Sequence, residues 1–106
     1  MTEKQLGQGR YNNTTNNTVY TATGVTAIIK SIRLCNTTGS AVTVRVFMVP
    51  SGGTADETTA IYYDYSIPAN STLSDDGFHV LLASGTVQFQ NGTANGVTIT
   101  LNGAEV

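Results

Sequence analysis

Charge is scarce in this sequence, and its distribution excludes one class of partner. Of the 106 residues only 11% are charged, against about 25% in an average domain. The five Lys and Arg residues are scattered, and the formal net charge is −2. A phosphate-binding surface needs clustered basic residues, so we expect no nucleic-acid partner.

Long apolar runs and paired cysteines are missing as well. No stretch approaches the length of about 20 apolar residues that a membrane-spanning helix needs, so we expect no membrane partner. No apolar segment follows residues 1–5, which argues against a secretory signal. Cys35 is the only cysteine and forms no internal disulfide, which favours synthesis in a reducing cytosol.

Threonine, asparagine and glycine are abundant instead, with 18, 9 and 11 residues. Threonine is β-branched and favours strands, whereas Asn and Gly supply the positive φ angles of tight turns. Six Asn-x-Ser/Thr triplets follow from this composition, and we interpret them as chance matches rather than glycosylation sites. A chain of 11.1 kDa has room for one domain.

Alternation of apolar and polar residues predicts about eight short strands and no helix. The expected strands cover residues 18–22, 26–35, 41–49, 60–67, 71–74, 78–83, 86–90 and 97–101. Turn residues rich in Gly, Asn, Asp and Pro separate them. The pattern is typical of an all-β fold: a single-domain antiparallel β-sandwich, either a jelly roll or an immunoglobulin-like arrangement.

Two strands carry predictions about which side chains face the core. The alternation in residues 26–35 slips at Lys30, where we expect a β-bulge. In residues 41–49 the even-numbered side chains are expected inside and Phe47 outside.

The first residues look different from the rest. Residues 1–17 have little apolar content besides Leu6 and Tyr11, and their Gly and Asn runs are typical of an extended arm. We therefore divide the chain into an N-terminal arm, 1–17, and a β-sandwich domain, 18–106. An arm that orders on binding can span a neighbouring molecule, with Leu6, Arg10 and Tyr11 as its expected anchors.

Three tyrosines crowd the strand at 60–67. Simple alternation places Tyr62 on the face opposite Tyr63 and Tyr65, and partly exposed. An exposed aromatic favours a partner surface, so Tyr62 is the fourth candidate interface residue; an ordinary half-buried tyrosine is the alternative.

Reactive groups are few. His79 is the only histidine, and no second His or Cys completes a zinc site. A general base at His79 would rest on nearby Asp75 and Asp76, and we favour a strand-edge histidine. Cys35 has no base placed beside it, and the acidic residues match no calcium-loop spacing. We expect no catalytic residue, no cofactor and no metal, hence a non-enzymatic protein.

Several stretches resemble small proteins encoded among tailed-bacteriophage structural genes. They are residues 4–10 (KQLGQGR), 25–32 (VTAIIKSI), 34–38 (LCNTT), 56–63 (DETTAIYY) and 92–98 (GTANGVT). The resemblance covers most of the chain and carries over no catalytic residue. Some similar small β-domains serve as capsid decoration (cement) proteins, and others as tail or fibre modules.

The resemblance implies a virion protein that is made in the host bacterial cytoplasm and located on the capsid surface. We expect it to self-associate, as a homotrimer that matches a capsid's local threefold axes, and to bind the major capsid protein. The alternative is a tail or fibre module that binds a host surface receptor or glycan.

Overall fold

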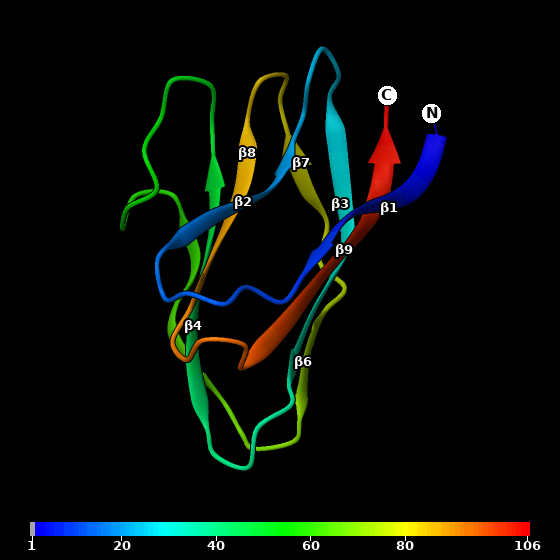
Figure 1. Cartoon of the computed structure of the whole chain (residues 1–106). Helices are drawn as coiled ribbons and strands as arrows, with labels where there is room; N and C mark the ends of the chain where they lie inside the picture. Colours follow the sequence, from blue (N-terminus) through cyan, green and yellow to red (C-terminus); the bar gives the residue numbers. More distant parts are fainter. Residues whose placement is uncertain (1) are drawn as a thin grey trace.

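The computed structural model describes residues 2–106, and these residues form nine strands in two antiparallel sheets without a helix (Figure 1). The strands are β1 (Thr2–Gly9), β2 (Asn16–Thr21), β3 (Ala27–Asn36), β4 (Val42–Val49), β5 (Ala60–Ile67), β6 (Thr72–Asp75), β7 (His79–Leu81), β8 (Thr86–Asn91) and β9 (Val97–Glu105). The all-β prediction is confirmed. Nothing helical in the described chain is long and apolar enough to cross a membrane.

The strand order distinguishes the two sandwich arrangements that the sequence left open. One sheet has the order β1-β9-β3-β6, with β7 also paired with β3, and the other has the order β2-β8-β4-β5. β7 pairs with residues 27–29 of β3 and β6 with residues 32–35, so β6 and β7 are two parts of one interrupted edge strand. Counted in this way, eight strands follow the order of a jelly roll.

The core lies between the sheets and explains the slip in the alternation of β3. Ala27 and Ile29 face the core before Lys30, and Ile32 and Leu34 face it afterwards. The register between β3 and β9 shifts between Ile29 and Ser31. The predicted bulge at Lys30 is therefore confirmed, since one extra residue inverts the period of two.

The N-terminal segment corrects one prediction. Residues 2–9 are not an unpacked arm, because β1 pairs with β9 along its length and Leu6 packs against the core. A Cβ at Gly7 would lie 2.7 Å from the Val19 carbonyl oxygen, so this glycine permits a close approach to β2. The strand was not predicted because its side chains are mostly polar. An edge strand is held by backbone hydrogen bonds and needs few apolar residues.

β5 departs from the alternation that the sequence suggested. Its register against β4 shifts, so that Tyr65 lies opposite Val44 and Tyr62 opposite Val46. The rings of Tyr62 and Tyr65 meet edge to face with centroids 5.5 Å apart, on the same side of the strand. The prediction that Tyr62 faces away from Tyr65 is wrong because a bulge, with Asp64 at φ 53°, lies between them. Tyr62 is half-buried, as expected.

Two asparagines of the Asn-x-Ser/Thr triplets, Asn36 and Asn91, are fully buried at strand ends. Asn36 Nδ2 donates to the carbonyl oxygens of Ser40 and Ile67, each at 2.9 Å, and its Oδ1 accepts from the Thr38 amide at 2.9 Å. Asn36 therefore joins the turn after β3 to the end of β5. Both amide side chains are 0% exposed, so neither is accessible to a glycosylating enzyme in the folded chain.

Candidate functional site

The four predicted interface residues lie at two different sides of the sandwich. Leu6 and Tyr11 pack against the core near β1, and the Tyr11 ring centroid is 6.2 Å from that of Phe89. Tyr62 lies in β5, an edge strand of the other sheet. Arg10, directly after β1, is the exposed member of the set. The structure does not bring the four together, and their contact with a partner stays a prediction.

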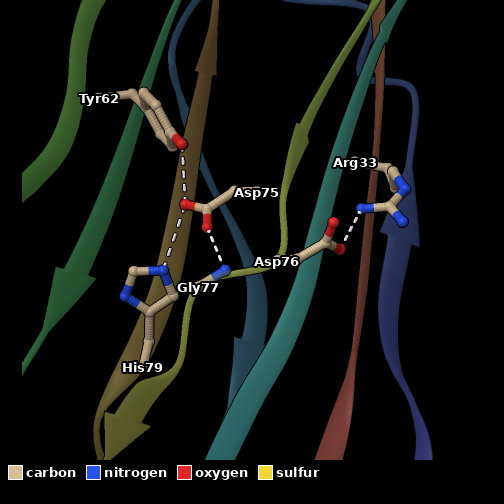
Figure 2. Close-up of polar contacts among 6 residues, drawn as sticks. All are labelled: Arg33, Tyr62, Asp75, Asp76, Gly77 and His79. Carbon is tan, nitrogen blue, oxygen red and sulfur yellow. Dashed lines mark hydrogen bonds and ion pairs between the residues drawn. The ribbon is translucent and has the colours of Figure 1, made fainter.

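A polar network joins the two sheets at the edge formed by β5, β6 and β7 (Figure 2). Tyr62 Oη donates to Asp75 Oδ2 at 2.8 Å, and His79 Nε2 lies 3.2 Å from the same oxygen. The Gly77 amide donates to Asp75 Oδ1 at 2.7 Å. Beside this network, Arg33 on β3 donates from Nη1 to Oδ1 of Asp76, the residue after β6, at 2.8 Å. Asp75 therefore connects β5 of one sheet to the interrupted edge strand of the other.

The protonation states of Tyr62 and Asp75 favour a structural hydrogen bond between the two sheets. Burial raises the pKa of Tyr62 to about 12, together with its hydrogen bond to Asp75, so the phenol keeps its proton. Burial also acts to raise the pKa of Asp75, but hydrogen bonds from Tyr62, Gly77 and His79 lower it further, so it lies below its usual value. Cys35 pairs with Thr72 at the other end of β6 and adds no thiol to this network. The three side chains hold the sheet edges together and present no activated nucleophile.

A pocket of about 470 Å³ opens on the outer face of the β2-β8-β4-β5 sheet. It is lined by Asn16, Arg45, Phe47, Ala55, Asp56, Glu57, Thr58, Tyr63 and Gln90. Asn16, Gln90 and Arg45 are neighbours in the register of β2, β8 and β4, so rigid strands position them. Residues 55–58 form the wall that the β4–β5 loop contributes.

Phe47 forms part of this pocket. It shares the outer face with Arg45, as expected, but it is only 2% exposed and lies outside the core cluster between the sheets. The β4–β5 loop lies beside it around the pocket. Phe47 therefore forms a buried apolar floor beneath the polar rim of the pocket.

The bulge in β5 fixes the charged part of the pocket. Arg45 Nε and Nη2 donate to Asp64 Oδ1 and Oδ2 at 2.6 and 3.1 Å, and Arg45 Cζ lies 4.0 Å from the Tyr63 ring centroid. Their mutual hydrogen bonds raise the pKa of Arg45 and lower the pKa of Asp64. The guanidinium is therefore paired, stacked and held in one orientation. Sequence reasoning missed this site because the bulge moves Tyr63 to the face of Arg45.

A third surface is apolar. Phe78, Val80 and Leu82 are 68%, 52% and 69% exposed, whereas Leu81 between them is 3% exposed. Val80 lies opposite Ile28 on β3 and alternates with the buried Leu81, which places it on the outer face of the first sheet, and Phe78 and Leu82 directly flank β7. We call Phe78, Val80 and Leu82 the β7 apolar patch. No Asp, Glu, Lys or Arg occurs between Asp76 and Glu105 in the sequence, so the strand that carries the patch is uncharged.

Among residues 2–106, no three His, Cys, Asp or Glu side chains gather as they would around a metal ion. Comparisons with models of protein families, with curated proteins and with solved structures found no match to this chain.

Proposed function

We propose that the protein is a non-enzymatic bacteriophage virion protein that self-associates, as a homotrimer, and decorates the capsid shell. The resemblance to tailed-phage structural proteins suggests the virion. The observation that supports self-association is the β7 apolar patch, three large exposed apolar side chains on and directly beside β7. Soluble monomers rarely expose a contiguous apolar patch larger than a few hundred Å².

A second copy of the chain fits this patch better than a charged partner. The patch and its strand carry no formal charge, so copies converge there around a threefold axis without like-charge repulsion. A stable interface buries roughly 800 Å² per partner, with an apolar centre and a polar rim. The β7 apolar patch supplies such a centre, and the polar surface around it supplies the rim. Capsid binding is then a property of the assembled oligomer.

Contact with the major capsid protein is assigned to the surface near β1. Because β1 is a strand of the sheet, deleting residues 2–17 would remove part of the fold together with any binding site. Arg10 is exposed and follows β1 directly, so it is the residue to test there. Arg10→Ala is expected to weaken binding to purified shells while the melting temperature stays unchanged.

Self-association is tested by sedimentation of the purified protein. We expect a trimer for the wild type and a monomer for Val80→Asp, because a buried carboxylate at the centre of the interface has no partner. Tyr65→Asp is the control, since Tyr65 is a 44% exposed aromatic outside the patch. A wild-type monomer at high concentration, or a Val80→Asp trimer, contradicts the role of the patch. Mass spectrometry of virions then tests the location, with hundreds of copies expected for a shell protein.

The pocket over Arg45 favours a second candidate function: a tail or fibre module that recognises a host surface receptor or glycan. A pocket of about 470 Å³ built on strands is a recognition feature that shell decoration alone does not need. A copy number of a handful per virion, together with binding of the isolated protein to host cells, would favour this candidate over the first.

A further inference from the structure

We infer that the pocket over Arg45 binds a neutral saccharide. This assignment rests on the second candidate function, recognition of a host surface by this face, and names the chemistry of the ligand. The volume of about 470 Å³ lies within the range of small-molecule sites, about 300–1,000 Å³. The lining combines aromatic rings with amides and carboxylates, and each part has a counterpart on a sugar.

The aromatic part of the pocket is fixed in place. Tyr63 is 44% exposed, and the guanidinium of Arg45 lies 4.0 Å from its ring centroid. Arg45 is itself held by two hydrogen bonds to Asp64. A sugar ring has apolar C–H faces that pack against an aromatic side chain, and a ring that is already positioned loses little entropy on binding.

The polar part offers both donors and acceptors. Asn16 and Gln90 contribute planar amides from β2 and β8, and Asp56 and Glu57 contribute carboxylates from the loop. Gln90 Nε2 donates to the Thr14 carbonyl at 3.1 Å, which orients the amide and leaves its oxygen to accept. Neighbouring hydroxyls of a sugar each donate and accept, so they match this mixture of groups.

The charges of the pocket argue against anionic ligands. Asp64 pairs with the guanidinium of Arg45, while Asp56 and Glu57 add two carboxylates to the lining. Hydrogen bonds from Thr58 lower the pKa of Asp56, so this carboxyl stays ionised near neutral pH. Acidic sugars and phosphates are therefore repelled. An apolar ligand would strip water from unpaired polar groups.

A second, smaller pocket extends the site. It holds about 90 Å³ and is lined by Thr43, Val44, Arg45, Asp64, Gln90 and Gly92. Arg45 and Gln90 line both pockets, so the two adjoin along the outer face of β4 and β8. A substituent of the bound sugar therefore has room to extend from the larger pocket into the smaller one.

The test is binding of the purified full chain to immobilised neutral oligosaccharides of hexoses and N-acetylhexosamines, with sialylated and uronic-acid oligosaccharides on the same array. We expect binding to a subset of the neutral glycans, and titration of one of them should show Tyr63→Ala and Gln90→Ala weakening the affinity about tenfold. Tyr65→Ala and Gln88→Ala are the matched controls. Tyr65 has the same 44% exposure on the other side of β5, and Gln88 lies on the strand of Gln90 outside the pocket lining.

Three results overturn the inference. They are no binding to any neutral glycan on the array, preference for the acidic glycans, or equal loss of binding in the control variants. Host-cell binding separates this failure from failure of the function. If host cells bind the wild type but not Tyr63→Ala, while the array stays empty, the saccharide is wrong and receptor recognition by the pocket stands. If neither cells nor glycans are bound, both are wrong.

Discussion

Replacing Tyr62 with Phe removes the hydroxyl that ties β5 to Asp75 and keeps the ring that packs against Tyr65. A hydrogen bond to a charged group contributes about 1.5–3 kcal/mol when well shielded. Because Tyr62 is only half-buried and the Asp75 side chain keeps some access to water, we expect a loss of about 1–1.5 kcal/mol. For a domain of this size the melting temperature should fall by roughly 4–8 °C.

The loss of stability in Tyr62→Phe should depend on pH, and the pKa shifts of Asp75 and Tyr62 give the direction. Folding lowers the pKa of Asp75 below its ordinary value of 3.8. Such a carboxyl stabilises the fold above its unfolded pKa, and this contribution disappears as the pH falls through the lower folded pKa. Tyr62 has its pKa raised to about 12, so its contribution is complete below its unfolded value of 10.0 and disappears as the pH rises towards 12. The difference between wild type and Tyr62→Phe is therefore largest between these limits.

Urea unfolding followed by circular dichroism measures this difference. Tyr65→Phe is the control, because the structure gives the Tyr65 hydroxyl no hydrogen bond within residues 2–106, and it should unfold like the wild type. The reasoning is refuted if Tyr62→Phe unfolds at the wild-type urea concentration, or if Tyr65→Phe loses as much stability. A deficit that stays constant below pH 3 would show that Asp75 is not the partner whose charge matters.

Three further predictions concern the fold. A Cβ at Gly103 would collide with a backbone carbonyl oxygen of β3, so Gly103→Ala should cost at least about 2 kcal/mol in urea unfolding, whereas Gly39→Ala, in open space, should cost little. Asn36→Ala removes several buried hydrogen bonds and should cost about 3 kcal/mol or more by the same measurement. In an ultraviolet titration, Tyr20 and Tyr62 should ionise only near pH 12, and this late phase should lose amplitude in each Phe variant.

Features of the fold that depend on the local pattern of apolar and turn residues could be predicted from the sequence. Residues 60–67 read as a strand because Pro68 ends a β-rich run, and β5 has these bounds. The slip at Lys30 was visible because apolar residues change parity on either side of it, and parity is what a bulge alters. The last strand was expected to end at residue 101, but β9 continues through residues 102–103 to Glu105 between β1 and β3. Backbone pairing on both sides overrides the turn preference of Asn and Gly there.

The candidate pocket could not be predicted, because it depends on pairing between distant segments. Asn16 and Gln90 are far apart in the sequence and become neighbours only when β2 pairs with β8. Tyr63 joins Arg45 only because β5 bulges, and nothing in the residues 62–65 marks the bulge before β4 lies beside them. The face of Arg45 and Phe47 was predicted, but the loop that covers Phe47 was not.

The two proposed surfaces are compatible because they lie on opposite faces of the sandwich. The β7 apolar patch is on the outer face of the sheet that contains β3, as the pairing of Val80 with Ile28 requires. The pocket over Arg45 is on the outer face of the other sheet. If the chain associates through the patch as proposed, each pocket stays open and a trimer presents several pockets at once. A weak saccharide site gains avidity in this arrangement, so Val80→Asp should reduce binding to a densely coated glycan surface far more than binding to the same glycan free in solution.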